Sequence, residues 1–163
     1  MIMDTTTAPT VTDQRASALR EELHSHCFAC SPDNDHGLNL VFRVDAEGVT
    51  RAIWHPSSAF QSYDGRIHGG ILATLIDASM VHALFARGIA GVTAEMTVRY
   101  LIPVLLGAPV EVATWLEAQI HGLYRLRAEV RQDGNLAARA SAKFMALPET
   151  NGNQVHGRQH SQS

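Results

Sequence analysis

The sequence contains few cysteines and few charges. Its two cysteines, Cys27 and Cys30, lie too close together to be the disulfide framework of a small secreted domain, so a reducing, cytoplasmic setting is predicted. Charged residues make up 18% of the chain, and the formal net charge is −3. This balance gives no general attraction for nucleic acid or for an anionic membrane, so neither is expected as a partner.

A secretory leader and a convincing membrane span are also missing. The first residues contain neither a basic segment nor an apolar one of leader type. Residues 69–86 approach the length of a membrane span but carry Asp77 near their centre, together with Thr74, Ser79 and His82. These groups are costly in hydrocarbon, so the stretch predicts a buried helix of a protein outside the membrane.

Apolar residues, in contrast, are plentiful enough for a core. They make up 45% of 163 residues, and a chain of this length is normally one domain. Residues 1–12 and 149–163 are polar and without periodicity. They are predicted to be disordered tails around a single domain over residues 13–148.

The first half of the chain predicts two helices with a β-hairpin between them. Apolar residues at helical spacing predict a short amphipathic helix over residues 13–24, capped by Asp13. Strand-like runs at 38–44 and 49–54 flank a glycine-containing turn and predict the hairpin. The second helix, over residues 68–88, has apolar residues on nearly every side, which indicates that other structure encloses it.

The second half of the chain predicts only strands. Four strand-like runs, separated by turns, cover residues 92–101, 110–120, 123–130 and 136–147. In the third run, Tyr124 and Leu126 alternate with Arg125 and Arg127, so one face of the sheet meets a core and the other meets water. A curved antiparallel sheet around the long helix, an α+β fold, is the simplest packing of these elements.

A sheet rolled around one long helix is the hotdog fold. The start of the helix, His68-Gly69-Gly70, followed by Asp77 nine residues after His68, resembles the phenylacetate-degradation (PaaI) type of hotdog thioesterase. The resemblance covers about residues 26–147 and implies hydrolysis of a small, aromatic or medium-chain acyl thioester, without a bound cofactor or metal. The thioester is carried by coenzyme A or by an acyl-carrier protein.

The front of the chain carries a second resemblance. Cys27 and Cys30, followed by Asn34 and by Gly37-Leu38, look like the C-x-x-C-G-x-x-N-x-x-G-L opening of one branch of these thioesterases. Ser31 stands where that branch has a glycine.

The resemblance implies roles around the helix start. Exposed N–H groups at a helix N-terminus stabilise negative charge, and glycines let a ligand oxygen approach them. Gly69 and Gly70 are therefore the candidate donors to the thioester carbonyl, and His68 is expected to orient the substrate. Asp77, the only ionised side chain of the helix, is expected to activate water as a general base or to attack the thioester directly.

Assisting residues lie on either side of the helix. Gln61 stands where many relatives have a polar amide, with Ser62 beside it as the alternative. Thr93 falls where the family has a hydroxyl that positions the water or the nucleophile. For the phosphates of coenzyme A, Arg66, Arg87 and Arg99 are unranked candidates.

Helix geometry separates the two halves of this site. Gly69 and Asp77 are eight residues apart, which is about 12 Å along an α-helix and too far to grip one carbonyl group together. We therefore expect Asp77 of one subunit to meet the helix start of another across a two-fold axis. The resemblance likewise implies a homodimer or a dimer of dimers.

The cysteine pair also permits a zinc interpretation, because His24, His26 and His36 lie close by in the sequence. Structural zinc sites usually show a second spaced pair, which this chain lacks, so thiols packed in a turn are favoured over a metal or redox site. His82 is expected to be a core histidine.

A binding module that senses acyl thioesters without hydrolysing them is the alternative function, because fold does not determine activity.

Overall fold

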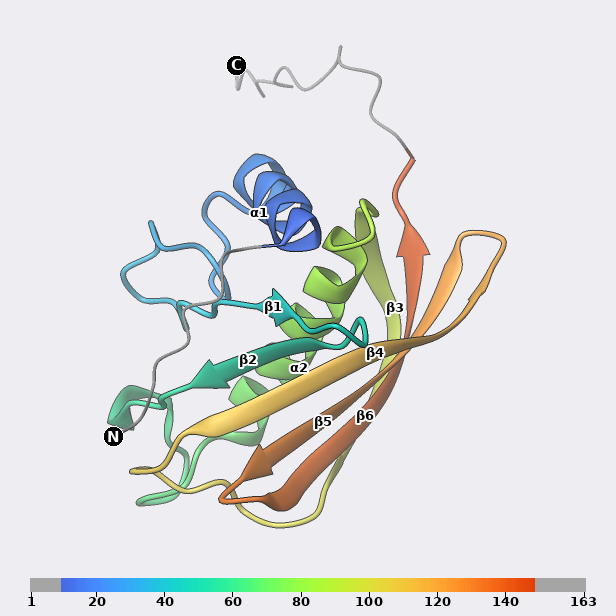
Figure 1. Cartoon of the computed structure of the whole chain (residues 1–163). Helices are drawn as coiled ribbons and strands as arrows, with labels where there is room; N and C mark the ends of the chain where they lie inside the picture. Colours follow the sequence, from blue (N-terminus) through green and yellow to red (C-terminus); the bar gives the residue numbers. More distant parts are fainter. Residues whose placement is uncertain (1–9, 149–163) are drawn as a thin grey trace, which may run out of the picture.

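One antiparallel sheet of six strands wraps around the central helix α2 (Figure 1). The structure is a computed structural model that describes residues 10–148. The strand order is β1-β2-β4-β5-β6-β3, so β1 and β3 form the two edges. The predicted hotdog-type α+β fold is confirmed. In chain order the elements are α1 (Val11–Leu23), β1 (Arg43–Val44), β2 (Thr50–Trp54), a 3₁₀ turn (Ser58–Phe60), α2 (Gly69–Phe85), β3 (Gly91–Tyr100), β4 (Val110–Ile120), β5 (Leu123–Gln132) and β6 (Asn135–Ala146).

Helix α1 begins earlier than its sequence pattern indicates. The N-cap is Thr10, whose hydroxyl accepts a hydrogen bond from the N–H of Asp13, while the Asp13 carboxylate accepts from the N–H of Thr10. The prediction that Asp13 is the cap is therefore wrong, because Asp13 is the third helical residue of a capping box. Of the two predicted tails, residues 1–9 and 149–163 lie outside the described part of the chain.

The hairpin has a much shorter first strand than predicted. Only Arg43 and Val44 pair with β2, because the N–H groups of Leu38 and Leu40 donate to the carbonyls of Phe28 and Ala29 instead. This segment of chain therefore lies on the 27–30 turn.

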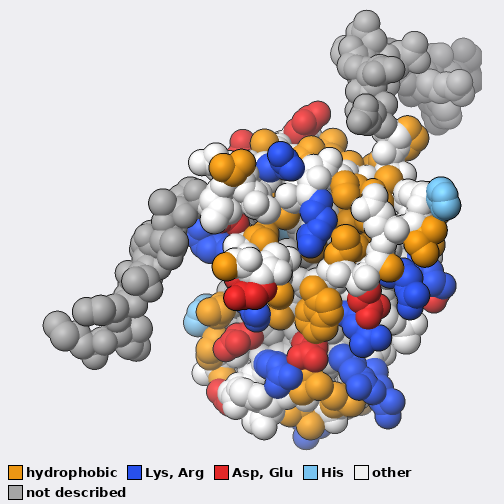
Figure 2. Space-filling view, turned by 45° about the vertical axis from the view of Figure 1, so that its right-hand side comes forward, with side chains coloured by type: hydrophobic (Ala, Val, Ile, Leu, Met, Phe, Trp, Pro, Cys, Tyr) orange, Lys and Arg blue, Asp and Glu red, His pale blue; other side chains and the backbone are white. Residues whose placement is uncertain are grey.

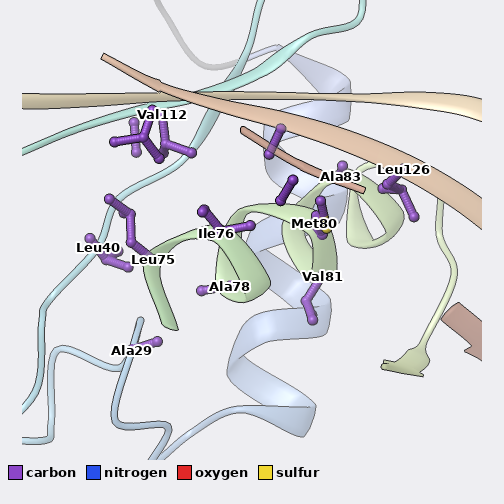
Figure 3. Close-up of a cluster of buried hydrophobic side chains, with 14 of the residues drawn as sticks. Ala29, Leu40, Leu75, Ile76, Ala78, Met80, Val81, Ala83, Val112 and Leu126 are labelled. Atoms are coloured by element: carbon purple, nitrogen blue, oxygen red, sulfur yellow. The ribbon is translucent and has the colours of Figure 1, made fainter. Parts of the chain in front are cut away.

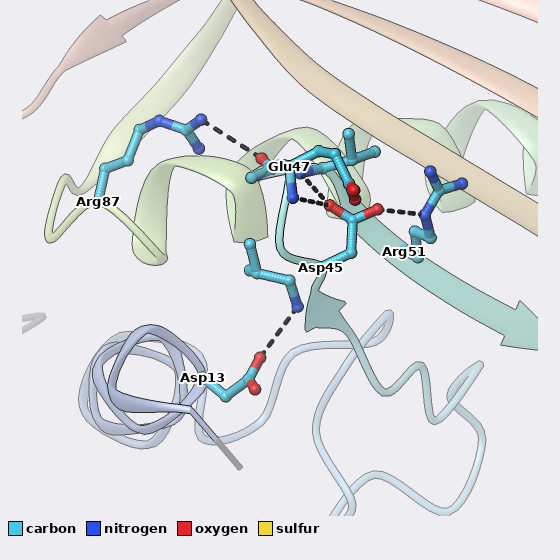
Figure 4. Close-up of polar contacts among 8 residues, drawn as sticks. Asp13, Asp45, Glu47, Arg51 and Arg87 are labelled. Carbon is cyan, nitrogen blue, oxygen red and sulfur yellow. Dashed lines mark hydrogen bonds and ion pairs between the residues drawn. The ribbon is translucent and has the colours of Figure 1, made fainter. Parts of the chain in front are cut away.

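Polar contacts attach the hairpin to both helices (Figure 4). The Asp13 carboxylate of α1 accepts a 3.0 Å hydrogen bond from the N–H of Val44, and Arg87, just beyond α2, donates to the carbonyl of Gly48 at 3.5 Å. Arg51 of β2 pairs with Asp45 at 2.7 Å. The hairpin thus connects α1 to the C-terminal end of α2.

Helix α2 is enclosed on two sides, as its unbroken apolar sequence predicts. Ile76, Met80 and Ala83 point toward the sheet, where Val112 of β4 and Leu126 of β5 meet them (Figure 3). Ala78 and Val81 point the other way, toward α1.

Within residues 10–148, no helix has the combination of length and apolar character that crossing a membrane requires.

The polar residues of α2 divide into buried and half-buried groups. Ser79 is fully buried and shares a 2.6 Å hydrogen bond with the hydroxyl of Thr114 on β4. His82 is also buried, as expected, and its ring stacks on Phe42 at 4.4 Å. Its Nε2 has no hydrogen-bond partner in the described part of the chain, and burial, followed by the nearby His24 and Arg20, lowers the pKa of His82 to about 3.

On the face that Figure 2 presents, Lys and Arg side chains are most frequent toward the lower right. Lys and Arg side chains lie there among Asp, Glu and hydrophobic side chains. The mixture agrees with the small net charge of the sequence.

Candidate active site

His68 is the N-cap of α2. Its backbone carbonyl accepts from the N–H of Ile71, and its Nδ1 accepts a 2.9 Å hydrogen bond from the N–H of Gly70. Nδ1 is thus the unprotonated ring nitrogen of a neutral ring, which leaves Nε2–H facing outward as a donor. Among the described residues the N–H of Gly69 has no acceptor, so Gly69 is the better placed of the two predicted carbonyl donors.

Asp77 is half-buried on α2, two turns beyond this helix start. Its Oδ1 accepts a 2.5 Å hydrogen bond from the hydroxyl of Thr93 on β3. The structure thus brings together two of the predicted site residues. It keeps Asp77 apart from Gly69, because α2 runs without interruption between them.

A β-bulge in β3 aims Thr93 at the helix. Thr93 pairs with Phe144 of β6, whereas Glu95 pairs with the very next residue, Lys143, so Ala94 is an extra residue on β3. Because paired residues share a face and Phe144 is fully buried, Thr93 faces the core side.

The same bulge lets a second side chain of β3 face α2. Tyr100 pairs with buried Ala138, although it is seven residues from Thr93 and regular alternation would place the two on opposite faces. Its hydroxyl donates a 2.7 Å hydrogen bond to the carbonyl of Gly69. Burial raises the pKa of Tyr100, so the hydroxyl keeps its proton for this bond.

No pattern in the sequence indicates a role for Tyr100. It is one of several aromatic residues, and only the register of β3 shows that it reaches the start of α2. A Cβ added to Gly69 would lie 3.5 Å from the Tyr100 ring, so this ring forms one wall of the space beside Gly69. Strand β3 therefore contacts both Asp77 and the helix start.

The loop before α2 holds the remaining amide candidate. Gln61 Oε1 accepts a 3.1 Å hydrogen bond from the N–H of Gly65, which closes the loop and leaves its NH₂ group unused among the described contacts. Ser62 is exposed, and its backbone N–H donates to the carbonyl of Arg66. Both residues are close to His68 in the sequence. The backbone N–H of His68 donates a 2.9 Å hydrogen bond to the carbonyl of Phe60, which holds this loop to the start of α2.

The arginine candidates lie in three different places. Arg99 lines a hollow on the outer face of the sheet with Trp115 and Arg127, so within one chain it is not beside Asp77. Arg87 is at the far end of α2, where it donates to the backbone. Arg66 is exposed in the loop that precedes α2, which makes it the candidate nearest to the helix start.

Two adjoining surfaces near these residues remain uncovered in the single chain. On α2, Gly70, Thr74 and Asp77 share one face, and none of them is buried. Strand β3 is an edge strand of ten residues that exposes Val92 and Tyr100. A long edge with exposed apolar side chains is a surface that proteins usually cover.

One cluster of metal-ligating side chains is found among residues 10–148, and it contains none of the predicted site residues. The donor atoms of His24, Cys27 and Cys30 all lie within 4.8 Å of one another, whereas His26 and His36 are outside the group. Burial, then the neighbouring Cys27, raises the pKa of Cys30 to about 12. A thiol with so high a pKa is not an activated nucleophile.

Residues 64–138 match the family model described as the thioesterase superfamily. This segment belongs to that superfamily. It contains the helix start, Asp77, Thr93 and Tyr100, so the predicted enzyme class, a thioester hydrolase, is confirmed at the level of the family. No curated protein matches the sequence.

Solved structures agree with the family assignment. A phenylacetic acid degradation-related protein of Ralstonia eutropha JMP134 is 27% identical, with a TM-score of 0.65 over 80% of this chain and 98% of its own. A thioesterase superfamily protein, RHA08564, is 25% identical with a TM-score of 0.70, and the match covers 74% of this chain but only 63% of that protein. The predicted PaaI-type resemblance is thus confirmed, while the branch with the cysteine opening stays a prediction.

A third structure agrees in fold. It is a hypothetical thioesterase of Streptococcus pneumoniae TIGR4, solved with coenzyme A, at 19% identity and a TM-score of 0.63 over 67% of this chain and 86% of that one.

Proposed function

We propose that this protein hydrolyses acyl-CoA thioesters to the free acid and coenzyme A, with Asp77 as the reacting carboxylate. The observation that carries the proposal is the hydrogen bond from Thr93 to Asp77, which fixes a half-buried carboxylate on a helix whose start leaves the Gly69 N–H unused. The similar pneumococcal structure was solved with coenzyme A, which supports coenzyme A as the thiol that leaves in the reaction.

The Thr93 bond leaves one carboxylate oxygen for chemistry. Oδ1 accepts from Thr93, so Oδ2 of Asp77 is free to take a proton from water. The resulting hydroxide attacks the thioester carbonyl carbon, the C–S bond breaks, and the departing thiolate receives a proton. A carboxylate held in one orientation has less conformational freedom to lose in this step.

The same oxygen also serves in a nucleophilic route. Oδ2 of Asp77 attacks the carbonyl carbon and the thiolate leaves, which forms a mixed anhydride that water then hydrolyses. A single turnover in H₂¹⁸O tests the nucleophilic route: label that enters Asp77 requires an anhydride that water opens at the Asp77 carboxyl carbon. Label in the acid product alone arises from the general-base route or from an anhydride opened at the acyl carbon, and trapping the anhydride with hydroxylamine, which yields an acyl hydroxamate, distinguishes these two.

Gly69 is the proposed donor to the carbonyl oxygen. The negative charge that develops on this oxygen is stabilised by the free N–H and by the positive end of the α2 dipole. The outward Nε2–H of His68 is a second donor at the same helix end. Gly70 contributes only if its N–H leaves the His68 ring.

Two subunits supply one site in this proposal. Asp77 and Gly69 are about 12 Å apart along α2, so the carbonyl group that one of them contacts is out of reach of the other. The uncovered face of α2 and the exposed edge of β3 support a two-fold dimer in which α2 of one chain meets α2 of the next.

The substrate range is proposed as small, aromatic or medium-chain acyl groups. It is tested by measuring thiol release from acetyl-, phenylacetyl-, benzoyl-, octanoyl- and palmitoyl-CoA with the wild type and with Asp77→Asn. The wild type is expected to turn over at least one of these substrates, and Asp77→Asn is expected to be about 10²- to 10⁴-fold slower. Equal turnover in both proteins, or binding of acyl-CoA with no turnover in either, contradicts the proposal, and the second outcome identifies a binding module.

Subunit complementation tests the shared site. Asp77→Asn and Gly69→Val are each inactive in the proposal, but a heterodimer of the two has one site with both lesions and one with neither. Co-expression at equal amounts is expected to restore about a quarter of wild-type activity, because half of the dimers carry one intact site out of two. No recovery in a mixture that forms heterodimers would place both residues in a single-chain site.

A further inference from the structure

Three metal-ligating side chains converge at the end of α1. His24 is the C-cap of that helix, and Cys27 and Cys30 follow at intervals of three residues. Their donor atoms all lie within 4.8 Å of one another. Between Cys30 Sγ and His24 Nδ1 the distance is 3.7 Å.

The local backbone explains why the three side chains share one side. The N–H of Cys27 donates to the carbonyl of His24, and the N–H of Ser31 donates to that of Cys27, each at 3.0 Å. Two successive turns therefore carry the chain onward from α1. Residues three apart on such turns lie on the same side, which brings the imidazole and both thiols together. The Ser31 hydroxyl donates to the carbonyl of Ser25 and holds the second turn against the first.

The spacing of the donor atoms fits a tetrahedral ion. With zinc–sulfur and zinc–nitrogen bonds of about 2.3 and 2.0 Å, a sulfur and a nitrogen ligand of one ion are roughly 3.5 Å apart. The observed 3.7 Å is close to this value, so these side chains need little movement to bind. Cys30 is buried while His24 and Cys27 are half-buried, which leaves one side open to water as a fourth ligand.

We propose that His24, Cys27 and Cys30 bind one Zn²⁺ ion per chain, with water in the fourth position. Thiolate and imidazole are the ligands that zinc prefers, and both thiol protons pass to solvent when the two Zn–S bonds form. The missing second cysteine pair, which argues against zinc in the sequence, is replaced here by a histidine that α1 delivers. This inference is independent of the thioesterase proposal.

The site's position points to a structural role. The His24 ring makes an edge contact with Phe85, near the last turn of α2, at 5.0 Å between ring centroids. An ion held by His24 and both cysteines would fix the C-terminus of α1, the 27–30 turn and, through Phe85, the end of α2. Metal binding is then coupled to the docking of α1, and zinc stabilises the folded chain by mass action.

Metal analysis of the intact protein tests the proposal. The full chain is purified with a non-chelating reductant and its zinc content is measured by mass spectrometry. About one zinc per chain is expected in the wild type, and also in His26→Ala and His36→Ala, whose imidazoles lie nearby in sequence but outside the cluster. In the double variant Cys27→Ser/Cys30→Ser, the zinc content per chain is expected to fall at least about tenfold. Retention of zinc by this double variant overturns the proposal.

A second measurement avoids any folding defect of the variants. The wild type is stripped of metal under reducing conditions and titrated with Co²⁺. Thiolate-to-cobalt charge-transfer absorption that saturates near one equivalent, together with a zinc-dependent rise in Tm, is expected. If no such absorption develops, or if Cys27 and Cys30 form a disulfide instead of taking up metal, the proposal is wrong.

Discussion

The hydroxyl of Thr93 donates a 2.5 Å hydrogen bond to Oδ1 of Asp77 and so connects the edge strand β3 to the central helix. This bond orders the one carboxylate of α2. It also makes the geometry of the carboxylate depend on the register of β3, because Thr93 reaches Asp77 only from the core-facing side of that strand.

Removing this hydroxyl is expected to reduce catalysis without unfolding the protein. Thr93→Val keeps the shape of the side chain but loses a hydrogen bond to a charged group, which is typically about 1.5–3 kcal/mol. We expect kcat/KM for acyl-CoA to fall roughly 10- to 100-fold. The matched control, Thr93→Ser, retains the donor and should stay within about threefold of the wild type. Equal loss in both variants would show that the hydroxyl is not the relevant group.

Tyr100 is expected to matter through its contact with the helix start. Tyr100→Phe keeps the ring beside Gly69 and deletes only the 2.7 Å hydrogen bond to its carbonyl. A bond of this kind is worth about 1 kcal/mol, so a three- to tenfold lower kcat and a slightly lower Tm are expected. Tyr63→Phe is the control, because Tyr63 is 77% exposed and its hydroxyl makes no hydrogen bond to the described residues. An unchanged kcat in Tyr100→Phe would restrict Tyr100 to packing.

Buried His82 should make the fold less stable in mild acid. Its pKa is about 3 in the folded chain but about 6.5 when unfolded, so below pH 6.5 the unfolded chain binds a proton that the folded chain does not. Stability from this residue is therefore complete above pH 6.5 and decreases toward pH 3, by about 1 kcal/mol per pH unit.

The variant His82→Leu isolates this effect. Urea unfolding of wild type and variant at pH 7 and pH 5 should show a smaller loss of unfolding free energy in the variant, by about 1–2 kcal/mol. Asp13 and Asp45 have pKa values below their ordinary 3.8, so they do not titrate in this interval. Burial also lowers the pKa of His24, and the negative charge of Asp77 offsets only part of this shift. His24 is present in both proteins, so its contribution cancels in the comparison. Identical slopes would contradict the assignment.

The capping box of α1 should contribute measurably to stability. Thr10→Ala removes the acceptor for the Asp13 N–H, and such caps are worth about 1 kcal/mol. Asp13→Ala should cost more, because the same carboxylate also accepts from the N–H of Val44. Thr10→Ser is the conservative control. Chemical unfolding of the three variants gives the comparison, and an Asp13→Ala variant as stable as Thr10→Ala would show that the bond to Val44 contributes nothing.

The sequence predicted the elements best where the pattern is local. The bounds of β4 are those expected, and α2 begins after His68, as its glycines indicate. The predicted strand over 38–44 is mostly absent for a non-local reason. Its alternation is genuine, but the N–H groups of Leu38 and Leu40 donate to the 27–30 turn rather than to β2. No propensity in a single segment specifies which neighbour will accept its hydrogen bonds.

The candidate site was predictable in part. A carboxylate in an apolar helix that starts with glycines is visible in the sequence, whereas the contact of Tyr100 with Gly69 is created by tertiary register. The proximity of His24 to the two cysteines is a similar case: the three-residue spacing is readable, but the two turns that align the side chains are not. In both cases a conformation of the backbone decides which side chains meet.

The extra residue in β3 constrains how this protein can change in evolution. Thr93 and Tyr100 share a face although seven residues separate them, because Ala94 occupies one extra position between them. Loss of Ala94 alone would restore regular alternation and leave Thr93 opposite Phe144 and Tyr100 opposite Ala138. A two-residue deletion in the same segment would keep the separation odd, so a bulge would still be needed for both side chains to reach α2. The segment is therefore expected to tolerate loss of the bulge itself better than a longer deletion.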